Sequence, residues 1–325
     1  MSSLLKRAIP LLLAVALLIY ALKDVAFTDI VRQFQEANYG YIALSAVLVL
    51  LNYGLRGLRW QQPLLAMGYQ PTGFRTTIAI MTGMVASMIV LGSGELTRCL
   101  TLQRTDGVPL SKGIGSVVAE RVLDLLMLGV ILLLTLMVEF ERVLAFGRNL
   151  GLSAPGPVLL IALGGAAVIG VVVLVGNLLG LDKHPFWQRI RGFGQGIWQG
   201  VLSVRQLPRP GLFIVLTVML QAVTWLSTYV MLLSLEVTRS LPSSAALSIL
   251  AAASIGGLAV PTQAGLGTYH FVVSRVLVLY GLTVADGVVI ATFQHTVGFG
   301  ISLVLSSVSF LVVPGLISQH HSVRQ

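Results

Sequence analysis

The chain has 325 residues, of which 56% are hydrophobic and only 10% are charged, whereas a soluble domain has roughly 25% charged residues. With a mean hydropathy of +0.90, too few charges are present to cover a water-soluble globule, which excludes a soluble enzyme, and the long apolar blocks exclude an outer-membrane barrel. The formal net charge of +9 indicates basic cytoplasmic loops and no nucleic-acid partner, because no basic run with interleaved aromatic residues occurs.

These properties predict an all-α polytopic membrane protein in the plasma membrane. A membrane-spanning helix needs ~20 apolar residues. The first apolar stretch follows Lys6 and Arg7, as in a signal peptide, but no small-residue cleavage site follows, so we expect an uncleaved span. About six full spans are expected, near residues 8–23, 40–58, 114–137, 157–179, 211–235 and 285–313.

Two shorter apolar stretches, residues 77–92 and 244–260, are each followed by a glycine-rich break and a short helix. The residues of these breaks are Gly92 and Gly94 in the first, and Pro261, Gly265 and Gly267 in the second. Short, interrupted segments are typical of re-entrant hairpins or broken helices. Two full crossings for each stretch would also satisfy the pattern.

The distribution of charge predicts the orientation. With the N-terminus inside, most Lys and Arg residues, among them Arg56, Arg59 and Arg98, fall on cytoplasmic segments, while acidic residues gather outside. The predicted orientation is therefore N-in and C-in. Residues 185–207 carry aromatic and arginine side chains at near-helical spacing, which indicates a cytoplasmic amphipathic helix at the interface or an ordinary loop helix.

The chain resembles itself at an offset of 174 residues, which places Gly281 against Gly107. The pair Glu120–Arg121 then falls on Gln294–His295. The repeat units, about 77–137 and 244–313 within a single transmembrane domain of residues 1–325, are separated by an odd number of crossings. They are therefore expected to be inverted relative to each other, as in alternating-access carriers.

Polar residues in these segments form a candidate transport path, because a charge at the bilayer centre costs at least ~2.5–3.5 kcal/mol. The alternative is a buried ion-pair cluster that only fixes helix register. His270 and His295 lack the spacing of metal ligands, and no metal, cofactor or catalytic motif is predicted. The path residues are Glu95, Arg98, Glu120, Arg121, Asp124, His270, Arg275, Gln294 and His295.

Three stretches, GSGELTR at 92–98, GVPL at 107–110 and AERVLDLL at 119–126, resemble the transmembrane region of lysylphosphatidylglycerol synthases, which is shared by flippase-like membrane proteins. LRGLRW at 55–60 fits the same pattern, and the resemblance covers about residues 10–313. Many members have a Glu shortly after the motif that corresponds to GLG at 265–267. This chain has Thr-Tyr-His at 268–270 instead, so His270 would take the role of that Glu.

The resemblance implies a flippase that moves a lipid or a lipid-linked anionic headgroup between leaflets, with no reaction catalysed, since the soluble lysyl-transfer domain is expected to be absent. Arg98, Arg121 and Arg275 would hold a phosphate, while the Glu, Asp and His side chains balance charge and could carry protons. Two alternatives are an accessory protein that docks an envelope-biosynthesis enzyme through its cytoplasmic segment, and a small-solute secondary transporter.

Overall fold

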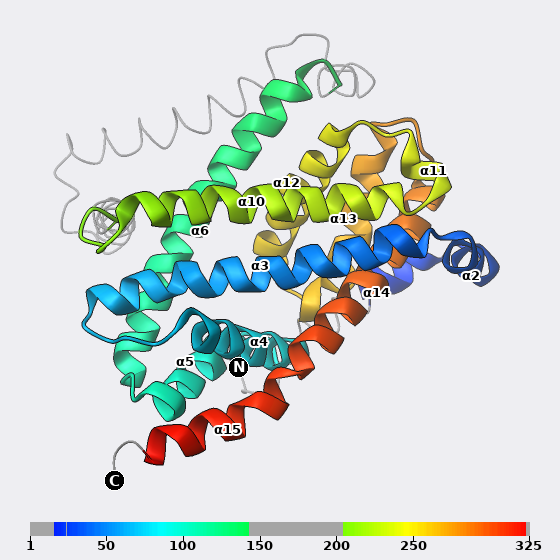
Figure 1. The fold of residues 1–325 in the computed structure, drawn as a ribbon. Coiled ribbons are helices and arrows are strands. Elements are labelled where there is room, and N and C mark those ends of the chain that lie inside the picture. The colour runs from blue at the N-terminus through cyan, green and yellow to red at the C-terminus, as the bar shows by residue number, and fades with distance from the viewer. Residues whose placement is uncertain (1–15, 24, 143–203, 323–325) are drawn as a thin grey trace, which may run out of the picture. The chain divides into compact units, whose positions relative to one another are not determined.

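The computed structural model describes residues 16–23, 25–142 and 204–322, and every regular element among them is helical (Figure 1). These residues divide into two compact units, one from Met1–Arg121 with Gln206–Gln325 and the other from Val122–Arg205. The helices that lie wholly within the described residues are α2 (Phe27–Glu36), α3 (Tyr39–Ala66), α4 (Gly73–Ile89), α5 (Ser93–Asp106), α6 (Leu110–Val138), α10 (Pro210–Leu233), α11 (Glu236–Arg239), α12 (Ser243–Ala259), the 3-10 turn η2 (Gln263–Gly265), α13 (Thr268–Val278), α14 (Val284–Ser307) and α15 (Ser309–Ser322).

Four described helices are long and apolar enough to cross a membrane: α3, α6, α10 and the stretch Val284–Gln319 formed by α14 and α15. They coincide with four of the predicted spans. The predicted span 8–23 is described only from residue 16, and residues 16–22 are helical. The predicted span 157–179 and nearly all of the predicted segment 185–207 lie outside the described residues.

Local sequence signals set the helix ends. The Asn38 side chain accepts a hydrogen bond from Gly40 N at 3.0 Å and caps α3. At α14, Thr283 Oγ1 accepts from Asp286 N at 3.1 Å, and Asp286 Oδ2 accepts from Thr283 N at 3.3 Å, which is a capping box. Helix α5 begins after Gly92, which has a φ of 77° that a side chain would disfavour.

Two helix–break–helix elements, α4–α5 and α12–α13, match the predicted short apolar stretches and their breaks. In the first, the helices touch through glycine: a Cβ on Gly94 would lie 2.6 Å from the Gly83 carbonyl oxygen. In the second, a Cβ on Gly256 would lie 2.8 Å from Val272 Cγ2. Small residues therefore let the paired helices pack at very short distance.

Helices α3 and α10 lie side by side and antiparallel (Figure 1). Ser45 pairs with Ser227 across this contact, and Asn52 Nδ2 donates to Thr224 Oγ1 at 2.9 Å. Side chains of α3, α4 and α5 form most of one apolar core. Side chains of α10 and of α12 to α14 form most of a second core, and a third lies between α3 and α10. The contact between α3 and α10 therefore connects the core around α4 and α5 with the core around α12 to α14.

We expect Gly57→Ala to lower the free energy of unfolding by about 1–3 kcal/mol, the usual cost of overpacking. A Cβ at this position would lie 2.8 Å from the Cα of Thr77, so α3 and α4 would have to separate. Thermal unfolding in detergent measures the change. Gly54→Ala is the matched control in the same helix, because nothing lies within 4 Å of its Cβ position. Equal losses in both variants would contradict the close α3–α4 contact.

Candidate functional site

Five charged side chains meet inside the first unit and form what we name the charged cluster: Arg59 of α3, Glu95 and Arg98 of α5, and Glu120 and Arg121 of α6. Arg59 Nη2 donates to Glu120 Oε1 at 2.7 Å, and Arg98 Nη2 lies 2.7 Å from Glu120 Oε2. Arg98 Nη2 also lies 2.6 Å from Glu95 Oε2, and Arg121 Nη2 lies 3.5 Å from Glu95 Oε1. The cluster is a continuous network centred on Glu120.

Burial divides the cluster into an inner and an outer part. The side chains of Arg59, Arg98 and Glu120 are 1%, 4% and 4% exposed. Those of Arg121 and Glu95 are 44% and 43% exposed. Charges removed from water require compensating partners, so Glu120 stabilises two arginines in the interior, while Arg121 and Glu95 remain accessible.

Trp60 fixes the orientation of the Arg98 guanidinium. The Cζ of Arg98 lies 4.6 Å from the centroid of the Trp60 ring, within the range of a cation–π interaction. The ring is held in turn, because Trp60 Nε1 donates to Ser116 Oγ at 2.9 Å. A planar guanidinium held in this way presents its remaining N–H groups in a fixed direction.

Arg98 has donors that the described residues leave without a hydrogen-bond acceptor. Its Nε and Nη1 are buried and have no such partner there, whereas Nη2 forms ion pairs with the carboxylates of Glu95 and Glu120. The side chain lines a pocket of about 120 Å³, which Arg56 and Glu95 also line. We name this the arginine pocket. An oxyanion such as a phosphate would satisfy these donors.

A second polar group, which we name the histidine cluster, contains Tyr269 and His270 of α13 with Gln294 and His295 of α14. Tyr269 donates its hydroxyl hydrogen to Gln294 Oε1 at 3.1 Å, and the two imidazole centroids are 4.9 Å apart. His295 Nε2 lies 2.9 Å from the Ala264 carbonyl oxygen. His270 Nδ1 and Gln294 Nε2 are buried without a hydrogen-bond partner among the described residues.

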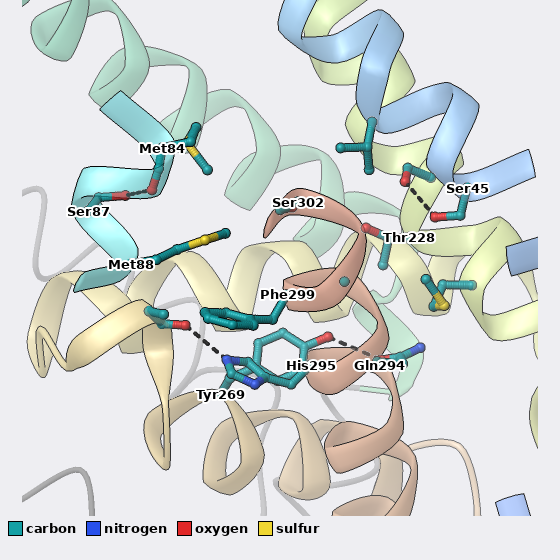
Figure 2. A pocket seen from close by; sticks show the side chains of 15 residues that line it. Ser45, Met84, Ser87, Met88, Thr228, Tyr269, Gln294, His295, Phe299 and Ser302 are labelled. Atoms are coloured by element: carbon teal, nitrogen blue, oxygen red, sulfur yellow. Dashed lines mark hydrogen bonds between the residues drawn. The ribbon is translucent and has the colours of Figure 1, made fainter. Parts of the chain in front are cut away.

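The histidine cluster opens on a cavity of about 380 Å³, which we name the central cavity (Figure 2). Figure 2 shows Phe299 beside the rings of Tyr269 and His295, and the centroids of Phe299 and His295 are 6.4 Å apart. The lining residues are Ser45, Val49, Met84, Ser87, Met88, Ser227, Thr228, Met231, Ala264, Tyr269, Gln294, His295, Gly298, Phe299 and Ser302.

Gln263 connects the second break to the end of α4. Its Nε2 donates to the carbonyl oxygens of Ser87 and Met88 at 3.0 and 2.8 Å. The next residue, Ala264, has a φ of 51°, an uncommon conformation for a residue with a Cβ. Its carbonyl oxygen contacts His295. The two elements with broken helices therefore touch beside the central cavity.

The predicted path residues fall into separate places. Arg275 is exposed on α13, with its guanidinium carbon 5.4 Å from the Phe271 ring centroid, apart from both clusters. Asp124 belongs to the second unit and is not assigned to either cluster. The structure brings together Glu95, Arg98, Glu120 and Arg121 in the charged cluster, and His270, Gln294 and His295 in the histidine cluster.

The predicted break residues lie at the ends of the helices. Gly92 is the residue before α5, and Gly94 packs on α4. Gly265 and Gly267 have φ angles of 77° and 78°, which glycine adopts without strain. Pro261 lies between α12 and η2 and is exposed.

Sequence reasoning missed Arg59, Trp60 and Gln263. It counted Arg59 and Arg98 among the cytoplasmic segments and did not foresee their burial: α3 continues to Ala66, and both arginines are buried against Glu120. The available signal was Arg56 and Arg59, three residues apart on a helix that directly continues an apolar span. Among the described residues, no group of three or more His, Cys, Asp or Glu could hold a metal ion.

Comparison with known proteins gives one match over most of the chain. A family model described as the lysylphosphatidylglycerol synthase TM region matches residues 7–306. Among curated proteins, Glycosyltransferase AglD of Haloferax volcanii is 25% identical over 100 residues. That match covers 30% of this chain and 16% of the relative. No solved structure matches the chain.

Proposed function

The chain belongs to the lysylphosphatidylglycerol synthase TM region family, and on this premise we propose that it is a flippase of the plasma membrane. In this proposal it moves a lipid, or a lipid-linked anionic headgroup, from one leaflet to the other, and performs no chemical reaction itself. The acyl or prenyl chains stay in the bilayer while the headgroup passes through the polar interior.

The observation that carries the proposal is Arg98, a buried arginine with unsatisfied donors at the edge of a pocket. Its Nε and Nη1 have no hydrogen-bond acceptor among the described residues, and a buried donor without a partner costs free energy. Ionisable groups at membrane depth typically mark a substrate path. A phosphate in the arginine pocket would accept these hydrogen bonds, while the accessible Arg121, 3.5 Å from the lining residue Glu95, would attract it.

The packing of the two broken-helix elements supports the view that they are re-entrant hairpins of an inverted repeat. Helices α4, α5, α12 and α13 have 17, 14, 17 and 11 residues, each shorter than the ~20 that a span requires. At the offset of 174 residues, Glu95 and Arg121 correspond to Tyr269 and His295. Both pairs lie close together, the first at 3.5 Å between charged atoms and the second at 5.6 Å between ring centroids.

The glycines at the start of α6 and α14 correspond at the same offset, and each packs closely on the preceding short helix, although Cys99 corresponds to Val273, the neighbour of Ser274. A Cβ on Gly113 would lie 3.2 Å from Cys99 Cβ, and a Cβ on the corresponding Gly287 would lie 2.8 Å from Ser274 Cα. Helices α3 and α10 precede the two hairpins and pack antiparallel. Inverted repeats whose hairpins meet near the midplane suit alternating access, and the contact of Gln263 with α4 is such a meeting point.

The test is translocation of labelled lipids in proteoliposomes that contain the full chain. We expect labelled anionic phospholipids or a polyprenyl phosphate to change leaflets faster than in protein-free liposomes, because the arginine pocket replaces the water that the headgroup loses. Labelled diacylglycerol, which lacks a phosphate, serves as the substrate control.

If no anionic lipid moved faster than in the protein-free liposomes, the flippase proposal would be wrong. The accessory role beside an envelope-biosynthesis enzyme would then become the better explanation. Uptake of a small solute without lipid movement would instead favour a secondary transporter.

A further inference from the structure

We propose that the central cavity and the arginine pocket together select a phosphodiester lipid whose headgroup is uncharged and rich in hydroxyls, a polyol or a sugar, over one whose headgroup carries an ammonium. The inference rests on the proposed function, since it names the class of lipid that the same path would take. The phosphate would lie at Arg98 and the uncharged headgroup in the central cavity.

The two pockets are neighbours. Met84 and Ser87 of α4 line both pockets. Arg98 lines the arginine pocket, and His295 lines the central cavity. The arginine pocket, at about 120 Å³, is smaller than the central cavity, at about 380 Å³, as expected if the first holds a phosphate and the second a larger headgroup. A single phosphodiester could therefore reach from one pocket to the other around the end of α4.

The central cavity contains hydroxyls and aromatic rings but no Asp, Glu, Lys or Arg among its described lining residues. Its hydroxyls come from several helices, through Ser45, Ser227, Thr228, Ser302 and Tyr269. Such groups exchange hydrogen bonds with ligand hydroxyls. An ammonium group in this cavity would be desolvated without a carboxylate beside it, which is unfavourable.

The orphan groups of the two pockets point to the same ligand chemistry. Gln294 is 5% exposed, and its Nε2 has no hydrogen-bond partner among the described residues. The Nε and Nη1 atoms of Arg98 are likewise buried without a hydrogen-bond partner among the described residues. These atoms are donors, so they require oxygen acceptors from the ligand, which phosphates and hydroxyls provide. An ammonium offers donors alone and would leave Gln294 unsatisfied.

The test measures equilibrium binding to the purified full chain, in a detergent that has neither sugar nor phosphate groups. The probes are short-chain phosphatidylinositol, phosphatidylglycerol, the lysyl ester of phosphatidylglycerol, and phosphatidic acid. We expect the first two to bind at least about tenfold more tightly than the lysyl ester, a ratio within reach of one unsatisfied hydrogen bond. Phosphatidic acid, which occupies only the arginine pocket, serves as the reference.

Gln294→Glu should reverse this order, because it replaces a donor with a carboxylate and keeps the acceptor of the Tyr269 hydrogen bond. Affinity for the two uncharged headgroups should fall and affinity for the lysyl ester should rise, while phosphatidic acid changes little. Gln35→Glu on the exposed surface of α2 is the control and should change none of them. Ser302→Asp places a carboxylate elsewhere in the cavity and tests the same reversal if Gln294→Glu does not fold.

Equal or tighter binding of the lysyl ester by the unmodified chain would overturn the inference, as would equal effects of the carboxylate variants on all four lipids. Binding and translocation separate the two proposals. The expected order of affinities without movement in liposomes would contradict the flippase and leave the headgroup selectivity standing. Movement of lipids without any headgroup preference would contradict the headgroup selectivity and leave the flippase proposal standing.

Discussion

Glu120→Gln is expected to lower the free energy of unfolding by about 3–5 kcal/mol, which is the typical cost of removing one partner from a buried ion pair. The Glu120 carboxylate contacts Arg59 and Arg98 at 2.7 Å, and all three side chains are almost fully buried. The neutral amide would leave the two guanidinium groups without this buried counter-charge. Thermal or denaturant unfolding in detergent measures the loss.

The matched control for this variant is Glu236→Gln. Glu236 also forms an ion pair at 2.7 Å, with Arg239, but its side chain is 79% exposed, so we expect a change below about 1 kcal/mol. Adding Arg59→Met to Glu120→Gln should restore part of the stability, because a positive charge is then removed from the interior. A Glu120→Gln variant as stable as the unmodified chain would show that Glu120 does not stabilise the cluster.

Arg121→Gln is expected to abolish lipid translocation while the protein remains folded. Arg121 is 44% exposed and lies 3.5 Å from Glu95, so its ion pair contributes little to stability. Glu95 lines the arginine pocket, so the charge of Arg121 lies close to this pocket, and we expect it to attract the headgroup phosphate. Proteoliposome translocation measures activity, and thermal unfolding measures the fold of the same preparation.

Arg104→Gln is the control for the loss of one positive charge, because Arg104 is exposed near the end of α5 and belongs to neither cluster. We expect this variant to translocate lipid at the rate of the unmodified chain. Normal translocation by Arg121→Gln would remove Arg121 from the path. Equal losses in both variants would indicate a general effect of charge at the membrane surface.

Helix type and the positions of the breaks were predictable because they depend on local chemistry. Apolar runs near 40–58 and 211–235 form α3 and α10, since a long apolar segment must satisfy its backbone within a helix. The break at Gly92 was also predictable, because glycine adopts a φ of 77° without strain.

The pairing of charges was only partly predictable. Glu95 and Arg98 are three residues apart on one helix, and this spacing brings their side chains together. Arg59 lies 61 positions from Glu120, and no local pattern relates them. Hydropathy and the positive-inside rule place such an arginine in a loop, whereas the continuation of α3 to Ala66 buries it.

A helical membrane protein with two glycine-interrupted segments follows from the order of the amino acids alone, because hydropathy and backbone conformation are properties of consecutive residues. The tertiary fold, in contrast, sets which polar residues share a pocket. It placed Arg59 and Trp60 beside Arg98, and it brought Gln263 to the end of α4. These contacts depend on how separate helices pack, and packing is set by side-chain shape over long sequence separations.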